Sequence, residues 1–409
     1  MTNAGHSPLW ERVDALGVRD LAVVGVSKHA GKTTALVRLI EDASRSGRRL
    51  GVASVGVDGE RVDSVLGTPK PPIPASAGGL LATAVGAMKE ASAPVQWIEP
   101  TGISSPFGEV WIGRAMAAGT ICLAGVRQLA HLLLLRERFH ALGADHVIYD
   151  GALSRMIAMH PDAVEGVVLA TGAVVGSMED VVRATRQGLR KVNIGLAEGA
   201  VARFCASQAG FVGVAVAAAE FPAVPADAVR PDAARPDAAE ANAFEPTAAR
   251  SGSAIPDAAE PTAVRPVAVR GAGENENRTP EWSRALLSDI KRYPGANAFT
   301  DDIRAAADLT ERHRVFYYSG AVTDAVAQSI LLRPYPSLLV AESPVHVFLS
   351  EGVWRQYTRR GHAVAVRRSA RLVGVMVNPV SPSGATLPRT MLRQRIEALT
   401  DVPVWDVME

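Results

Sequence analysis

The chain has 409 residues, of which 48% are hydrophobic and 21% are charged, so it can bury a substantial core as two domains or as one large α/β domain. Its 43 lysines and arginines balance 42 aspartates and glutamates, which gives no electrostatic reason to expect nucleic-acid binding. Its two cysteines, Cys122 and Cys205, are far apart and form no CxxC pair. This argues against a disulfide scaffold and a thiolate zinc site, and favours a reducing compartment.

Targeting and membrane segments are not evident in the sequence. The first 17 residues include Glu11, Arg12 and Asp14 and lack the apolar core of a signal peptide. The longest apolar stretches, such as residues 166–176, are shorter than the roughly 20 residues that a membrane helix needs. We therefore expect a soluble, cytoplasmic protein with no membrane partner and no nucleic-acid partner.

The elements predicted in residues 1–217 alternate between strand and helix. Apolar runs bounded by turn residues predict strands at 21–25, 50–55, 146–149 and 166–170, and helical periodicity follows Lys32 and recurs at 126–142 and 177–188. Alternating strands and helices indicate βαβ units. The fold class predicted is α/β, a mostly parallel sheet with helices on both faces.

Residues 218–280 differ sharply in composition from their surroundings. The segment is rich in Ala, Pro, Asp and Arg, contains imperfect repeats such as VRPDAARPDAAE, and has few large apolar residues. Proline recurs too often for a helix, and the segment cannot bury enough apolar area to offset its ordering entropy. We expect a disordered linker or insert that spaces two halves, with docking of a partner as the alternative.

The chain is thereby divided into an N-terminal α/β block at 1–217, the insert at 218–280 and a C-terminal α/β block at 281–409. Within the last block the patterns predict helices at 281–293, 324–332 and 389–399 and strands at 315–318, 337–341, 372–377 and 402–405. This block either forms a second domain or continues the first sheet, with the insert looping out.

A phosphate-binding loop is the strongest signal in the sequence. In DLAVVGVSKHAGKTTALVRLIEDASRSG, a strand ends at Gly25, and Gly31-Lys32-Thr33 opens an amphipathic helix. Backbone N–H groups at such a helix start form an anion site. Lys32 would face the β- and γ-phosphates, and Thr33 would offer its hydroxyl to Mg²⁺. In GxxxxGK[ST] the first glycine would stand at position 26, but this chain has Val26 there and a glycine one residue earlier, at Gly25. The loop makes the predicted sheet P-loop NTPase-like and residues 1–217 a P-loop nucleotide-binding block.

The residues expected to contact the nucleotide are Gly25, Ser27, Lys28, His29, Ala30, Gly31, Lys32, Thr33 and Thr34. One class of P-loop ATPases has a second lysine at the position that Ser27 occupies. Lys28 is therefore either a catalytic lysine acting across a possible homodimer or a solvated loop residue.

Two acidic residues follow predicted strands and could serve Mg²⁺ and the attacking water. Asp150 ends the strand in HVIYDGALSR, the pattern of a Walker B carboxylate, and Asp58 follows the strand in GVASVGVDGE. We assign Lys32, Asp58 and Asp150 to catalysis and Thr33, Asp58 and Asp150 to the metal. The alternatives are a helix-cap or turn aspartate before Gly151 for Asp150 and an Asp-Gly turn for Asp58, and Glu60 is a weaker candidate.

Other polar residues lie beyond the ends of predicted strands, where ligands gather in open α/β sheets. Asn378 could read a base edge through its amide or simply form an Asn-Pro turn. Thr171 closes another strand, and Arg155 is either a phosphate contact or a surface ion-pair residue.

The motifs together resemble a known family. VGVSKHAGKTT, VASVGVDGE, TPKPPI, SPFGEVWI, LAGV, IYDGALSR, GVVLATGA, VFLSEG, VNPVSPSG and VPVWDV occur in an order that is similar to the ATPase subunit of the lysine 5,6-aminomutase reactivase. The resemblance covers most of both ordered blocks and omits the insert.

The resemblance implies an ATPase that acts with a MutS-like partner subunit. Such a pair restores an adenosylcobalamin-dependent aminomutase that holds damaged cobalamin, with ATP and Mg²⁺ as cofactors. Lys32 and Thr33 match the family's phosphate loop, Asp150 its DGA aspartate and Asp58 its DGE aspartate. No cobalamin site of the chain's own is visible.

Two other functions remain open. A small-molecule ligase resembling dethiobiotin synthetase would share the P-loop and need a substrate pocket beside the γ-phosphate. A GTP-binding adaptor resembling molybdopterin-guanine dinucleotide accessory proteins would prefer GTP, although the sequence shows no NKxD guanine motif.

Overall fold

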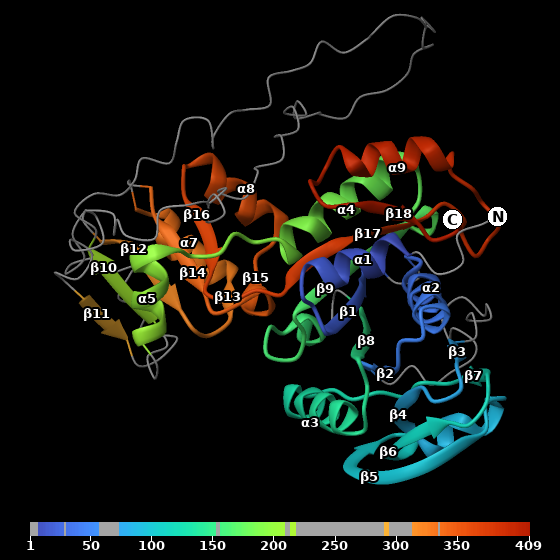
Figure 1. Ribbon diagram of the computed structural model, residues 1–409. Helices are drawn as coiled ribbons and strands as arrows, with labels where there is room; N and C mark the ends of the chain where they lie inside the picture. Colours follow the sequence, from blue (N-terminus) through green and yellow to red (C-terminus); the bar gives the residue numbers. More distant parts are fainter. Residues whose placement is uncertain are drawn as a thin grey trace, which may run out of the picture.

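The computed structural model describes residues 7–27, 30–56, 73–152, 156–208, 213–217, 290–293, 313–333 and 336–409. They form an α/β fold built on two sheets, which stand side by side in Figure 1. The predicted insert at 218–280 lies outside the described residues. Among the described residues, no helix combines the length and apolar character that crossing a bilayer requires.

The first sheet has nine strands and is mixed but mostly parallel. In spatial order they are β18 (Val404–Asp406), β17 (Arg371–Asn378), β9 (Gly166–Gly172), β1 (Asp20–Gly25), β8 (His146–Ala152), β2 (Leu50–Ser54), β4 (Leu80–Ala84), β6 (Gly108–Ala115) and β5 (Val95–Ser105). Strands β18 to β4 in this order run parallel, and β6 and β5 continue the sheet antiparallel.

Helices cover both faces of the first sheet, which explains why its central strands are apolar on both sides. One face carries α1 (Pro8–Ala15) and α2 (Lys32–Arg45), and the other carries α3 (Leu129–Ala141), α4 (Met178–Val192) and α9 (Arg389–Glu397). Strand β1 alternates between them: Val23 packs with α1 and α2, and Val24 with the opposite core.

The second sheet has five strands. In spatial order they are β11 (Ile290–Tyr293), β10 (Gly213–Ala217), β12 (His313–Tyr318), β14 (Leu338–Ala341) and β16 (Ala363–Val366), of which β12, β14 and β16 are parallel. One core joins them to α7 (Asp324–Leu331) and α8 (Glu351–Arg359), and a second core joins them to α5 (Gly199–Ser207).

Short elements complete the described chain. They are the antiparallel pair β3 (Ile73–Ala75) and β7 (Gly119–Ile121), the parallel pair β13 (Val322–Thr323) and β15 (Val347–Phe348), and the 3₁₀ turns η1 (Val85–Glu90), η2 (Met156–Met159), η3 (Ala173–Val175) and η6 (Pro344–His346).

The carboxyl edge of the second sheet packs against the loop between β8 and β9. Arg368, which follows β16, forms ion pairs with Asp162 of that loop and with Glu342, which follows β14. The turn η2 contacts η6, and the rings of His160 and His346 lie 6.1 Å apart. The segment that follows Asp150 is therefore in contact with the second sheet.

The predicted strands are all present, although β18 begins at Val404, later than the sequence pattern predicts. The predicted helices at 126–142, 177–188, 324–332 and 389–399 are present with shifted ends. The helix predicted at 281–293 is wrong over its last residues, because Ile290–Tyr293 is strand β11, paired with β10; its other residues lie outside the described chain.

The C-terminal block contributes to both sheets. Strands β17 and β18 belong to the first sheet, whereas β11, β12, β14 and β16 belong to the second. The chain therefore leaves the first sheet after α4, builds the second, and returns along β17, which Figure 1 shows running between the two.

Candidate functional site

The carboxyl ends of β9, β1 and β8 meet at one edge of the first sheet, because these strands are adjacent and parallel. In open α/β sheets this edge is where ligands bind. The predicted site residues Gly25 and Asp150 lie on β1 and β8, and Gly31, Lys32, Thr33 and Thr34 follow β1.

Gly25 is the last residue of β1, and its environment explains the shifted glycine of the loop. A Cβ at Gly25 would stand 3.1 Å from the Ser27 carbonyl oxygen and 3.4 Å from the Lys32 Cβ. Val26 donates its N–H to the Ala170 oxygen at 2.9 Å and packs against the core. The loop thus turns tightly over Gly25, while Val26 extends the strand pairing. Lys28 and His29 lie outside the described residues.

Gly31 caps the start of α2 in a left-handed conformation, with φ of 82°. In the described chain no side chain caps this helix start, and its first turn, Lys32 to Ala35, has no acidic residue. The first-turn N–H groups of a helix lack intrahelical partners and favour anions. Ala30 is fully buried beneath the loop. This end of α2 therefore fits a phosphate group.

Lys32 forms an ion pair with Asp150, with Nζ 2.7 Å from Oδ1. The two side chains are 23% and 10% exposed. The register of β1 and β8 sets Val23 opposite Asp150, which brings the carboxylate beneath the first turn of α2. The contact is one of charge, since its geometry is not that of an aligned hydrogen bond. The structure thus brings together two of the three predicted catalytic residues.

The remaining predicted acidic residues and Arg155 are not placed. Asp58, Glu60 and Arg155 lie outside the described residues. The chain that leads toward Asp58 starts beside Asp150, since the Val55 N–H donates to the Asp150 carbonyl oxygen at 2.6 Å. Among the described residues no group of three or more His, Cys, Asp or Glu side chains could hold a metal. Thr33 and Asp150 are the described members of the predicted Mg²⁺ set.

Gly125 supports the candidate site at the end of β2, and the sequence analysis did not single it out as a site residue. A Cβ there would stand 1.5 Å from the Ser54 carbonyl oxygen. The Gly125 N–H donates to the Gly56 oxygen at 2.8 Å, and the Val126 N–H to the Ser54 oxygen at 3.0 Å. The LAGV motif thus fixes the end of β2 next to Asp150. The glycine inside that motif was the available signal.

Asn378 ends β17 and lies against the phosphate loop. A Cβ at Gly31 would stand 2.6 Å from the Asn378 Cβ. Asn378 Oδ1 accepts the Val380 N–H at 3.0 Å, which forms the Asn-Pro turn considered as an alternative role. The side-chain oxygen is therefore used within the turn. Thr171 is buried and accepts a hydrogen bond from Thr185 at 2.8 Å, so it links β9 to α4.

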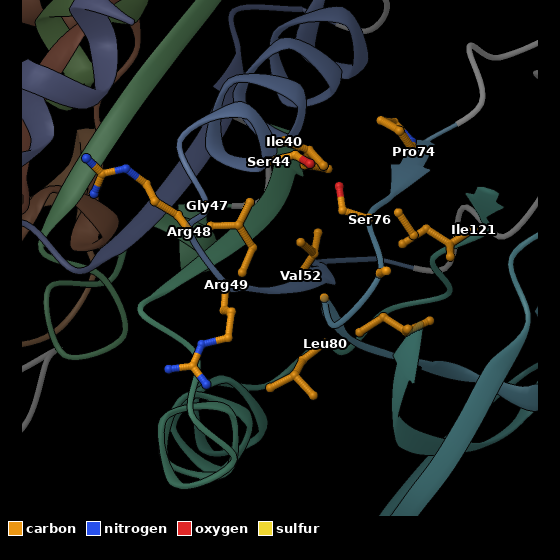
Figure 2. Close-up of a pocket in the computed structure, with 15 residues that line it drawn as sticks. Ile40, Ser44, Gly47, Arg48, Arg49, Val52, Pro74, Ser76, Leu80 and Ile121 are labelled. Carbon is orange, nitrogen blue, oxygen red and sulfur yellow. The ribbon is translucent and has the colours of Figure 1, made fainter. Parts of the chain in front are cut away.

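Two hollows lie at opposite edges of the first sheet. A cavity of about 130 Å³ sits at the amino ends of β2 and β4, between the last turns of α2 and strand β3 (Figure 2). Figure 2 shows the guanidinium groups of Arg48 and Arg49 pointing away from Ile121, and Arg48 is held by Asp14 at 2.6 Å. The charged groups of these two arginines are thus turned outward, and the cavity lies at the end of α2 opposite to Lys32.

The second hollow follows β17, on the same side of the sheet as Asn378. It is a mostly apolar groove of about 350 Å³, lined by Pro379, Val380, Thr386, Leu387, Pro388, Arg389 and Met408. Arg389 is held by Asp406 at 2.6 Å. Of the two hollows, this groove is the one next to the predicted phosphate loop, because its lining begins at Pro379, directly after Asn378, and Asn378 lies against Gly31.

No protein-family model, curated protein or solved structure matches this chain.

Proposed function

We propose that this chain is a P-loop ATPase that binds ATP with Mg²⁺ through the loop ending in Gly31-Lys32-Thr33. Lys32 carries this proposal. It begins α2 directly beyond the central parallel strand β1, and its ammonium lies 2.7 Å from a carboxylate on the neighbouring strand. An ammonium, uncapped helix N–H groups and an adjacent carboxylate form a combination that suits a magnesium-bound polyphosphate.

The roles follow from position. The N–H groups at the start of α2 bind the phosphate oxygens, and Lys32 neutralises the β- and γ-phosphates. Thr33, half-buried in the first turn, offers a hydroxyl and Asp150 a carboxylate to the cation. When bound, Mg²⁺ supplies charge neutralisation as water attacks the γ-phosphate. The ammonium of Lys32 stays beside the β- and γ-phosphates during this step and stabilises their negative charge.

We further propose that the hydrolysis drives reactivation of an adenosylcobalamin-dependent aminomutase, together with a MutS-like partner subunit. Support comes from the resemblance described above and from where its motifs lie. VGVSKHAGKTT, IYDGA, GVVLATGA and VNPVSPSG are far apart in sequence, yet they end β1, β8, β9 and β17 at one edge of the sheet. A set of motifs that shares one edge is consistent with one nucleotide-responsive site.

A small-molecule ligase is the second candidate, and the groove beyond β17 favours it. A ligase needs a substrate pocket near the γ-phosphate, and this groove adjoins Asn378, which contacts the loop at Gly31. Its lining is largely apolar, with Arg389 already paired. Hydrolysis that requires a small amine or acid, without any protein partner, would favour the ligase over the reactivase.

Calorimetry with Lys32→Ala tests the nucleotide site. Loss of a charge-assisted contact, worth about 1.5–3 kcal/mol, lowers affinity for magnesium-bound ATP by at least about tenfold. Lys191→Ala, an exposed lysine on α4, is the matched control and leaves affinity unchanged. Parallel titrations with GTP separate the ATPase from the GTP-binding adaptor. Equal ATP binding and hydrolysis by Lys32→Ala and wild type would show that the site is wrongly assigned.

Stimulation by partners tests the reactivase. The purified chain is expected to turn over ATP slowly and to accelerate when the MutS-like subunit and the aminomutase are added. An aminomutase should also be recovered in a pull-down with the chain. Turnover that neither partner changes would count against the reactivase while leaving the ATPase intact.

A further inference from the structure

Asp150 holds the ammonium that the proposed function assigns to the phosphates. Lys32 Nζ lies 2.7 Å from Asp150 Oδ1, so an incoming triphosphate competes with this carboxylate for Lys32. We propose that Asp150 is a specificity-determining residue that makes the site select the magnesium-bound triphosphate and reject the metal-free form. This inference rests on the proposed function and deepens it.

The location of Asp150 makes the competition costly. Its side chain is 10% exposed on β8, which is flanked by β1 and β2 with Val23 and Ser54 opposite Asp150. Taking Lys32 away leaves a nearly buried carboxylate without a countercharge. Removing one partner of such a pair is far more costly than separating an exposed pair.

The incoming phosphates add to that cost. A metal-free triphosphate brings several negative charges toward Asp150 while removing the ammonium. Among the residues that the structure describes, no basic side chain other than Lys32 is paired with Asp150. A triphosphate that arrives with Mg²⁺ carries a positive charge for Asp150, so Lys32 can be given up to the phosphates. The exchange of partners is balanced in charge only when the cation is present.

The test compares affinities for ATP with excess Mg²⁺ and with a chelator. Wild type is expected to bind the magnesium complex at least about tenfold more tightly than the metal-free nucleotide, as expected for coupling between close, buried charges. Asp150→Asn keeps the shape and removes the charge. It is expected to bind metal-free ATP at least about tenfold more tightly than wild type does, which reduces or abolishes the preference.

Asp145→Asn is the matched control. Asp145 precedes β8 at its other end, is 45% exposed and faces Arg49 at 3.7 Å, so its loss removes the same charge away from the loop. Its magnesium preference should equal that of wild type. If melting shows that Asp150→Asn is unfolded, Asp150→Ser removes the same charge with a smaller side chain, and the same gain is required of it.

A double-mutant cycle separates the ion pair from plain repulsion. With Lys32→Gln there is no ammonium to contest, so Asp150→Asn should improve metal-free binding by much less than in wild type. Affinities are read by displacement of a fluorescent ATP analogue. An equal gain in both backgrounds overturns the role of the pair.

The failures of the inference and of the proposed function are distinguishable. Folded wild-type protein that binds no triphosphate, with or without Mg²⁺, defeats the proposed function. Wild type that binds magnesium-bound ATP but shows no preference over the metal-free form overturns the inference alone. The inference alone is also overturned if Asp150→Asn does not bind metal-free ATP more tightly than wild type does.

Discussion

Gly31 and Asn378 lie so close together that a Cβ added to Gly31 would stand 2.6 Å from the Cβ of Asn378. Gly31 also has φ of 82°, where residues with side chains are strained. One residue starts α2 and the other ends β17, so the phosphate loop is closed by a strand from the far end of the chain. Glycine is required at position 31 by conformation and by contact.

Gly31→Ala is expected to lower stability by more than about 2 kcal/mol, because the left-handed conformation costs about 1–2 kcal/mol and the contact adds to it. Nucleotide affinity should fall as well, since the loop must move. Urea unfolding and calorimetry measure the two effects.

Gly47→Ala is the control for conformation alone. Gly47 has φ of 70° and nothing within 4 Å of an added Cβ. Its cost should stay near about 1 kcal/mol, and Asn378→Gly should recover part of the Gly31→Ala loss. Equal losses of stability in Gly31→Ala and Gly47→Ala would show that Asn378 moves aside and that its contact with the added Cβ costs nothing.

Gly125→Ala is expected to be among the most damaging small substitutions in the described chain. Its Cβ would overlap the Ser54 carbonyl oxygen at 1.5 Å, and a backbone atom cannot move aside as a side chain can. We expect a loss of several kcal/mol, beyond the usual range of about 0.5–3 kcal/mol. Thermal unfolding measures it. Gly352→Ala, in α8 with open space around its Cβ, should instead be neutral or stabilising by about 0.5–1 kcal/mol.

Glu342 should make stability depend on acid pH. Burial by itself would raise the pKa of Glu342, but hydrogen bonds from Arg367 and Tyr317 outweigh burial and lower the pKa from 4.5 to about 2. A lowered carboxyl pKa contributes stability that is present above pH 4.5 and is lost as the pH falls through about 2. The shift corresponds to about 3 kcal/mol.

Glu342→Gln is therefore expected to lower stability at pH 7 by about 3 kcal/mol and to flatten the pH dependence between 4.5 and 2. Urea unfolding across that range measures both effects. Glu397→Gln removes an exposed carboxylate on α9 and should change stability at pH 7 by less than about 0.5 kcal/mol. A wild-type curve that is already flat below pH 4.5 would contradict the assignment.

The two cysteines should differ in reactivity. Burial raises the pKa of the Cys205 thiol to about 12, and the residue is 1% exposed, so almost no accessible thiolate exists at pH 8. Cys122 is half-buried. A disulfide-exchange reagent should modify Cys122 first, and Cys122→Ser should remove the fast phase while Cys205→Ser leaves it. A fast phase that persists in Cys122→Ser would mean that the α5 core opens readily.

The central strands and the helix start at Gly31 could be predicted from the sequence because their signals are local. A run of buried residues such as β1, followed by Gly31 and Lys32, carries its own pattern. Asp150 was proposed as a site residue by the same logic, as a polar residue at the end of an apolar run, and the structure shows it paired with Lys32.

What the sequence could not provide is the order of strands in space. The contact of Gly31 with Asn378 depends on β17 lying beside β9, and no local pattern encodes that neighbour. Strand β4, the antiparallel strands β6 and β5 that follow it in the sheet, and the strand Ile290–Tyr293 were missed for the same reason, since pairing partners decide their conformation.

The return of the chain along β17 has a consequence for biosynthesis. Strand β9 is translated before the second sheet, whereas its neighbour β17, which carries Asn378, is translated after it. Until then the nascent first sheet exposes the hydrogen-bonding edge of β9, which invites mispairing or chaperone binding. Completion of the phosphate loop is thereby linked to synthesis of the last part of the chain.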